Sequence, residues 1–154
     1  MALRIAEGGL DDPRVIALLA LHVSRARAVT PPGSSHALDL SGLRQPTISF
    51  WSGWDGEALA VVGALKRMSE ADGEVKSMHT AEALRGRGHG RAMLAHIIDA
   101  ARAQGLTRLW LETGSFGYFD AARAMYAESG FVECGPFGDY RPDPNSTFTT
   151  LALG

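Results

Sequence analysis

The sequence predicts one α/β domain of the α+β kind, with a mixed, mostly antiparallel sheet that contains one parallel strand pair and has helices on both faces. Two strand patterns, Thr47 to Trp54 and Ala58 to Met68, are joined by the turn dipeptide Asp55-Gly56, which is typical of a hairpin. A helical pattern over Gly88 to Ala103 stands between two strand-like segments, as in a crossover unit. The chain has 154 residues, close to the commonest size of one domain, so we expect residues 1–154 to form a single domain.

The first elements are predicted from local signals. Ala2 to Ala6 has the pattern of a short strand. A helix is expected from Pro13 to about Val29, because Asp12 can cap its start and proline is favoured at the first helical position. Two prolines and a glycine in Thr30 to Ser35 break this helix and begin a loop that we expect to cover a pocket.

The later elements complete the sheet. The strand over Glu74 to Thr80 extends the antiparallel meander, and the crossover helix makes it a parallel neighbour of a strand over Thr107 to Thr113. The remaining predicted elements are a short helical turn around Ala37 to Leu43, a helix over Phe119 to Ser129, and strands over Phe131 to Cys134 and Thr147 to Ala152.

Composition excludes several classes of protein. The net charge is -2, from 15 basic and 17 acidic residues, so no overall cationic field draws the chain to nucleic acid or to anionic lipid. Cys134 is the single cysteine, which excludes an internal disulfide and a structural zinc site made of thiolates. No apolar run reaches the roughly 18 residues of a membrane span, and the start of the chain lacks a signal-peptide core. We therefore expect a cytoplasmic protein with no metal, membrane or nucleic-acid partner.

A glycine- and arginine-rich loop, Arg85 to Arg91, lies between a predicted strand and the start of the crossover helix. Glycine lets the backbone approach a ligand closely, and the first helical turn presents unpaired amides and a favourable dipole to an anion. The loop fails the P-loop pattern, because Arg91 and Ala92 follow its last glycine, and it also fails the dinucleotide fingerprint. Two interpretations stay open on this evidence, a pyrophosphate site and a basic loop that only caps the helix.

The sequence resembles the GCN5-related N-acetyltransferases. Their signature at such a strand-to-helix junction is Arg or Gln, two residues, Gly, one residue, and Gly or Ala, which Arg85, Gly88 and Gly90 match. A second family element is matched downstream by Met125, Tyr126, Gly130 and Phe131. The order of the predicted elements agrees with the family along nearly the whole chain, so the resemblance implies its mixed-sheet fold.

The resemblance also implies a coenzyme site. In the family, the loop amides bind the pyrophosphate of acetyl-coenzyme A, and the preceding strand lends backbone hydrogen bonds to the pantetheine arm. Phe119 stands where many members have an asparagine that contacts this arm. The cofactor-binding residues expected here are Met78, His79, Thr80, Arg85, Gly86, Arg87, Gly88, His89, Gly90, Arg91, Phe119 and Tyr126. Glu82 and His89 depart from the family's usual proline and aliphatic residue, but neither change removes a backbone donor.

Acetyl transfer to an amine needs a neutral nucleophile and a proton for the leaving thiolate. Tyr126 resembles the family's general acid, and a phenol is protonated at neutral pH. Glu112 is the expected base, because clefts in such sheets open at the carboxyl ends of strands. His36 and His79 are rival bases, since imidazole titrates nearest to neutral pH. Cys134 is disfavoured as a covalent nucleophile, because it falls in a predicted strand.

Fewer sequence motifs indicate the site that binds the acceptor amine. Leu111 to Gly114 and the segment around Tyr140 resemble a bacterial subgroup of small acetyltransferases, which implies a formed acceptor pocket. The substrate-binding residues expected are His36, Trp51, Glu112, Thr113 and Tyr140. Trp54 is a further candidate for the pocket lining, and Arg44 and Arg141 are candidates for binding an acceptor carboxylate.

The function expected is an acetyl-CoA-dependent N-acetyltransferase that acts on a primary amine of a small molecule or peptide by direct attack in a ternary complex. Two alternatives are a non-catalytic acyl-CoA-binding sensor and a phosphate- or RNA-binding module. An RNA binder should show a continuous basic and aromatic face, which this near-neutral chain lacks. The acceptor's identity and a homodimer remain open.

Overall fold

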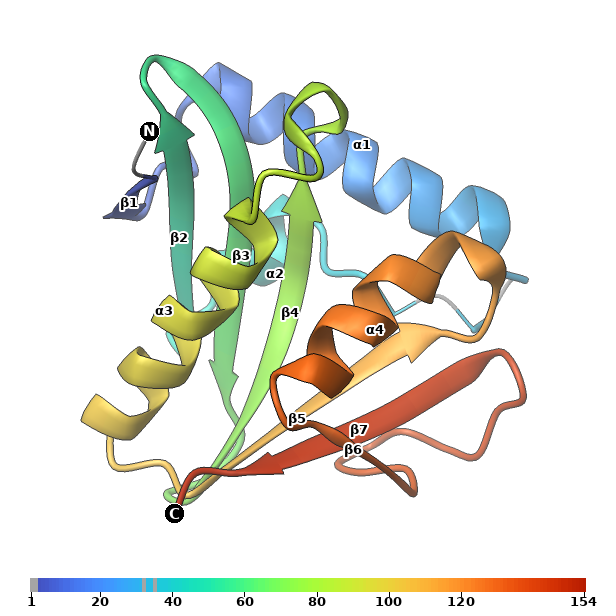
Figure 1. Cartoon of the computed structure of the whole chain (residues 1–154). Helices are drawn as coiled ribbons and strands as arrows, with labels where there is room; N and C mark the ends of the chain where they lie inside the picture. Colours follow the sequence, from blue (N-terminus) through green and yellow to red (C-terminus); the bar gives the residue numbers. More distant parts are fainter. Residues whose placement is uncertain (1–2, 32, 35) are drawn as a thin grey trace.

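The computed structural model describes residues 3–31, 33–34 and 36–154. Their strands form one seven-stranded sheet in the order β1-β2-β3-β4-β5-β7-β6 (Figure 1). The helices are α1 (Pro13–Val29), α2 (Leu40–Leu43), α3 (His89–Ala103) and α4 (Asp120–Glu128), with short 3-10 turns η1 (Glu82–Leu84) and η2 (Gly117–Phe119). The strands are β1 (Arg4–Glu7), β2 (Ile48–Asp55), β3 (Ala58–Arg67), β4 (Asp72–Thr80), β5 (Arg108–Gly114), β6 (Val132–Cys134) and β7 (Ser146–Ala152).

The predicted fold class is confirmed. Helix α1 begins at Pro13 because the side chain of Asp12 accepts a hydrogen bond from the amide of Arg14. Strands β2 and β3 form the predicted antiparallel hairpin, and β4 and β5 are parallel on either side of α3. The first strand begins later than predicted, at Arg4, and Ala2 lies outside the described residues, as do Pro32 and Ser35 of the predicted loop.

Two apolar cores lie on opposite faces of the sheet. One contains Leu94 and Ile97 of α3 and Tyr126 of α4, all buried. The other contains Val15 and Leu19 of α1. Each helix places apolar residues at three- and four-residue spacings toward the sheet, as expected for a helix packed on one side. Helices α3 and α4 therefore cover one face, and α1 covers the other (Figure 1).

Strands β4 and β5 pair only at their beginnings. Asp72–Glu74 of β4 pairs with Arg108–Trp110 of β5, although β4 continues to Thr80 and β5 to Gly114. Past this point the two strands diverge, and Figure 1 shows the V-shaped opening between them. Strand β5 instead pairs along its whole length with β7. The split in the sheet therefore lies at the carboxyl ends of two neighbouring parallel strands, where α/β sheets commonly bind ligands.

Strand β4 carries a bulge beside this opening. The register against β3 runs from the pair Val62 and His79 to the pair Ala64 and Lys76, so β4 has one more residue than β3 over this stretch. Ser77 lies in the bulge with a φ of 59°. A bulge bends its strand and increases the local twist, which accounts for the departure of β4 from β5.

Candidate active site

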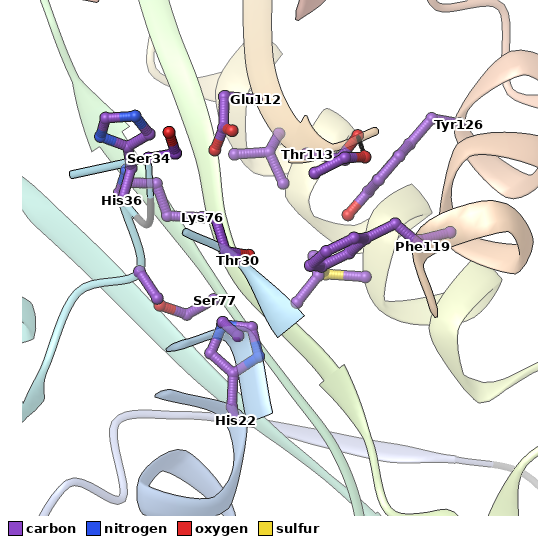
Figure 2. Close-up of a pocket in the computed structure, with 16 residues that line it drawn as sticks. His22, Thr30, Ser34, His36, Lys76, Ser77, Glu112, Thr113, Phe119 and Tyr126 are labelled. Carbon is purple, nitrogen blue, oxygen red and sulfur yellow. Dashed lines mark hydrogen bonds between the residues drawn. The ribbon is translucent and has the colours of Figure 1, made fainter. Parts of the chain in front are cut away.

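The split between β4 and β5 contains a cavity of about 100 Å³ (Figure 2). Its walls include Lys76 and Met78 from β4 and Glu112 and Thr113 from β5. Helix α1 contributes His22, while α4 contributes Tyr126. Because α1 and α4 cover opposite faces of the sheet, the cavity joins the two faces through the gap between the strands. A ligand on one face can thus meet a ligand on the other.

Tyr126 lies on the α4 side of this cavity. Its side chain is buried, with 6% of the residue exposed, and packs edge-to-face on Phe131 at 5.8 Å between ring centroids. Figure 2 shows the hydroxyl end of the ring directed toward the space beside Phe119 and Thr113. Burial raises the pKa of the Tyr126 phenol, so the group keeps its proton at neutral pH. The arrangement suits a proton donor.

Phe119 is held against the end of β5. A Cβ atom added to Gly114 would lie 2.2 Å from the Phe119 ring, so only glycine at this position allows the ring its place. Arg123 of α4 donates a hydrogen bond of 2.5 Å to the carbonyl of Gly114. These contacts fix the start of α4, and with it Tyr126, relative to the opening between the strands.

Glu112 lies on β5, on the cavity wall away from α4. Side chains alternate along the strand, so Leu111 enters the core under α3 and α4 while Glu112 faces the opposite side. Burial raises the pKa of the Glu112 carboxyl. Figure 2 shows the carboxyl oxygens directed into the cavity. A carboxyl group with a raised pKa is better matched to accepting a proton near neutral pH than an exposed one.

A buried polar network lies next to Glu112 and joins two residues that were not predicted, Glu74 and Lys76, to the predicted Tyr140. Lys76 Nζ donates to Oε2 of Glu74 at 3.1 Å and to the hydroxyl of Tyr140 at 3.0 Å. The Tyr140 hydroxyl in turn donates to the same Glu74 oxygen at 2.5 Å. His36 packs edge-to-face on the Tyr140 ring at 4.9 Å. A signal was present, because Glu74 and Lys76 are charged residues at alternate positions of a predicted central strand.

Two histidines face each other on the α1 side. Nδ1 of His22 lies 3.1 Å from Nδ1 of His79, and burial lowers the pKa of each ring to about 4. Both rings are neutral at pH 7, and one Nδ1 donates to the other. His22 lines the cavity, whereas the His79 ring is buried beside α1 and is not among the cavity walls. His79 was predicted as a rival base, whereas His22 was not predicted to lie at the site.

The loop from Arg85 to Arg91 leads into α3 with its amides open. Gly86 and Gly88 have φ values of 79° and 82°, in the left-handed region that glycine adopts without strain. The first backbone hydrogen bond into α3 is donated by Ala92 to Gly88, so the amides of the preceding helical turn have no intrahelical acceptor. These exposed glycines, the helix start and the loop arginines fit a pyrophosphate group.

The His89 side chain does not share this open position. It is buried, and its Nε2 lies 3.2 Å from Oδ2 of Asp55 at the end of β2. Arg87 lies 3.7 Å from the same carboxylate, and Arg91 forms an ion pair with Glu128 of α4. The side chains of the loop therefore anchor it to the hairpin and to α4, while its backbone stays free toward solvent.

The structure brings several of the predicted site residues to one place. Met78, Thr113, Phe119, Tyr126, Glu112 and His36 line one cavity. Tyr140 borders an adjoining cavity that it shares with His36 and Lys76. Thr80 lies near the loop, because its Oγ1 is 3.4 Å from the position of a Cβ on Gly90.

Three predicted acceptor residues are not brought to the cleft. Trp51 lies in the core on the α3 side, with its ring 5.4 Å from His96, and Trp54 lies in the core beside α1. Both belong to β2, which is separated from the opening by β3. Arg44 forms an exposed ion pair with Asp11 at 2.8 Å.

Within the described ranges, no group of three or more side chains is arranged to ligate a metal ion. None of the helices in this part of the chain is long and apolar enough to cross a membrane.

Comparisons with known proteins show the family of the chain. Residues 15–131 match the acetyltransferase (GNAT) family. The chain is 48% identical over 144 residues to the uncharacterized N-acetyltransferase YedL of Escherichia coli, covering 94% of this chain and 91% of the relative. It is 45% identical over 144 residues to the uncharacterized N-acetyltransferase YsnE of Bacillus subtilis, covering 94% and 95% of the two chains.

Solved structures share the fold. A crystal structure of a Klebsiella pneumoniae protein superposes with a TM-score of 0.83 at 28% identity, covering 99% of this chain and 98% of that one. A Bacillus subtilis acetyltransferase solved in complex with CoA superposes with a TM-score of 0.73 at 18% identity, covering 98% and 99%. The fold, the cleft and the relatives define an acyltransferase. The chain belongs to the acetyltransferase (GNAT) family.

Proposed function

We propose that this protein is an acetyl-CoA-dependent N-acetyltransferase that acts on a primary amine of a small molecule or peptide by direct attack in a ternary complex. One observation carries the proposal. The cavity that passes through the sheet between β4 and β5 has the Tyr126 phenol on one side and the Glu112 carboxyl on the other. A donor on the α4 side and an acceptor on the α1 side can therefore meet without a covalent enzyme intermediate.

The donor site is proposed at the start of α3. The amides of Gly86 to Arg91 would hold the pyrophosphate, and the backbone of Met78 to Thr80 would hold the pantetheine arm. When bound, acetyl-CoA supplies a thioester whose acetyl group is activated for transfer to an amine. Arg85 adds positive charge beside the loop, which favours a diphosphate over a neutral ligand, whereas Arg87 and Arg91 pair with Asp55 and Glu128.

The reaction is proposed to use two side chains of the cleft. Glu112 accepts a proton from the acceptor's ammonium, directly or through a water molecule, so that the amine nitrogen gains a free electron pair. As the new carbon–nitrogen bond forms and the carbon–sulfur bond breaks, the Tyr126 hydroxyl gives its proton to the leaving sulfur. The nitrogen then releases its second proton through water, which restores the Tyr126 hydroxyl, and Glu112 gives its proton to solvent. A backbone amide of Met78 to Thr80 would stabilise negative charge on the carbonyl oxygen.

The setting of the reaction is part of the proposal. We propose that residues 1–154 act as one N-acetyltransferase domain in the cytoplasm, without a nucleic-acid or membrane partner. The net charge of -2 and the single cysteine support this setting.

The test is the Tyr126→Phe variant. It should bind acetyl-CoA with unchanged affinity in a calorimetric titration, because the ring and its packing are kept. Its kcat, measured by release of free coenzyme A with an accepted amine, should fall at least about 100-fold, as expected when a general acid is lost. Tyr118→Phe is the matched control, since Tyr118 is an exposed tyrosine near the same helix. Full activity of Tyr126→Phe would remove Tyr126 from the mechanism.

A further inference from the structure

Ser77 combines two unfavourable features in the bulge of β4. Its φ of 59° is in the left-handed region, where a non-glycine residue is strained. The residue is only 8% exposed, and its hydroxyl has no hydrogen-bond partner among the described residues. Glycine would relieve the strain and leave no orphaned hydroxyl. Ser77 lines the cavity. A ligand bound in the cavity can therefore supply the hydrogen-bond partner that the Ser77 hydroxyl lacks among the described residues.

Lys76, the neighbouring residue, also has hydrogen-bonding capacity left over. An ammonium has three donors, and the structure assigns two of them, to Glu74 and to Tyr140. Glu74 Oε2 accepts from both Lys76 and the Tyr140 hydroxyl, which fixes the network in place. The Lys76 side chain is 9% exposed and lines both the cavity and the adjoining one. Its third donor is therefore available to a ligand.

Glu112 supplies the opposite charge across the gap. It lies on β5, whereas Lys76 and Ser77 lie on β4, and all three line the same cavity (Figure 2). None of the ion pairs formed within the described part of the chain involves Glu112. The acceptor side thus presents a carboxylate on one strand and an ammonium with a hydroxyl on the other. This pattern complements a molecule that has both an amine and a carboxylate.

We propose that the acceptor is a small amine that also carries a carboxylate, of the amino-acid class, and that Lys76 and Ser77 bind this carboxylate while Glu112 receives the amine. The inference rests on the proposed function and specifies its substrate class. The carboxylate would complete the hydrogen bonding of Ser77 and place a negative charge on the free side of Lys76. Charge-assisted hydrogen bonds of this kind are about twice as strong as neutral ones.

The first experiment compares matched acceptors with the wild-type protein. Each amino acid is paired with the amine that lacks only its carboxylate, such as phenylalanine with phenethylamine, leucine with isopentylamine, and lysine with cadaverine. Release of coenzyme A from acetyl-CoA gives kcat/KM for each compound. We expect at least a 10-fold preference for the carboxylated member of any accepted pair, about the value of one charge-assisted hydrogen bond.

The second experiment assigns the preference to the two residues. Ser77→Gly removes the hydroxyl and the backbone strain together, so this variant should melt no lower than the wild type. Its preference for the carboxylated member should fall about 3- to 10-fold, mainly through KM. Ser77→Ala keeps the strained backbone and should lose the same preference. Ser115→Ala, at an exposed serine after β5, is the matched control and should change nothing.

The third experiment tests the role of the Lys76 charge in a variant that also neutralises its partner Glu74. The double variant Glu74→Gln/Lys76→Gln removes both buried charges and keeps amide donors and acceptors at both positions. We expect its kcat/KM ratio for each pair to approach 1, because only the carboxylated member loses a charged partner. A purely structural role of the network would instead lower both members of a pair equally.

The outcomes separate the two proposals. If amines release coenzyme A but the wild type shows no preference for the carboxylated members, the carboxylate site is overturned and the proposed function stands. The same conclusion follows if the preference persists in both the Ser77 variants and the double variant. If acetyl-CoA binds but no amine in either set releases coenzyme A or gives a binding isotherm, the proposed function is overturned and the carboxylate site falls with it.

Discussion

The two sides of the cleft are built in different ways. The coenzyme side is one continuous segment, Arg85 to Arg91, whose backbone amides would contact the ligand while side chains such as His89 anchor it to Asp55. The acceptor side is assembled from side chains of α1, β4, β5 and the segment before β7, among them Lys76 and Tyr140. A backbone site tolerates changes in side chains but depends on glycine. A side-chain site depends on the identity of each residue.

The two sides of the cleft also differ in how far their charged side chains are exposed to solvent. The arginines of the coenzyme side are exposed and act in high dielectric, so their charge favours a diphosphate without a large desolvation cost. On the acceptor side Glu74 is 4% exposed, and the Lys76 ammonium pairs with it at 3.1 Å. Buried charges interact more strongly but are costly when left unpaired. We therefore expect the acceptor side to control specificity and the coenzyme side to control affinity for the shared donor.

The largest effect is expected on the acceptor side, from Glu112→Gln. Its kcat/KM for an accepted amine should fall about 100-fold near neutral pH, because the proposed base is lost, while acetyl-CoA affinity is unchanged. In the wild type, kcat/KM should decline as pH falls through the pKa of Glu112, which burial raises, and the variant should lack this limb. Glu133→Gln, at an exposed residue on β6, should keep the wild-type profile.

Stability gives an independent check on Glu112. Because burial raises the pKa of this carboxyl in the folded state, the folded protein favours its protonated form, and the contribution to stability is lost as pH rises through the folded-state pKa. Glu112→Gln should therefore increase Tm relative to the wild type more at pH 8 than at pH 4. A difference in Tm that does not change with pH would contradict the raised pKa.

A smaller effect is expected on the coenzyme side, from Gly88→Val. Its φ of 82° is strained for a β-branched residue, so the loop should rearrange and the Kd of acetyl-CoA should rise about 10-fold. Gly105→Val is the control, because Gly105 has a φ of 81° just beyond the other end of α3, with open space around both positions. Both variants should lose similar stability in thermal melts, but only Gly88→Val should weaken coenzyme binding. Equal Kd values for the two variants would remove the loop from the site.

This contrast explains what the sequence revealed. The loop was found because Arg85, Gly88 and Gly90 are close in sequence and carry a recognisable spacing. Of the acceptor network, Tyr140 was expected, but its partners Glu74 and Lys76 were not, because Lys76 and Tyr140 are 64 positions apart and only tertiary packing brings them together. Trp51 was expected at the acceptor pocket that the family resemblance implies, but it packs in the core on the α3 side. The alternation of side chains along β2 predicts that the residues on either side of Trp51 face away from it. Alternation alone does not predict which face of β2 packs under α3.

The last effect is on stability alone and concerns the histidine pair, which belongs to neither side's proposed chemistry. Burial lowers the pKa of His22 and His79 to about 4, whereas both titrate near 6.5 when unfolded. Between these values the unfolded chain binds more protons, so stability is present above about pH 6.5 and is lost as pH falls toward 4. Each histidine contributes a slope of up to about 1.4 kcal/mol per pH unit. In urea melts from pH 7.5 to 4.5, His79→Gln should show a shallower loss of unfolding free energy than the wild type, while the curves should run parallel above pH 6.5. Parallel curves over the whole range would show that burial does not keep His79 neutral.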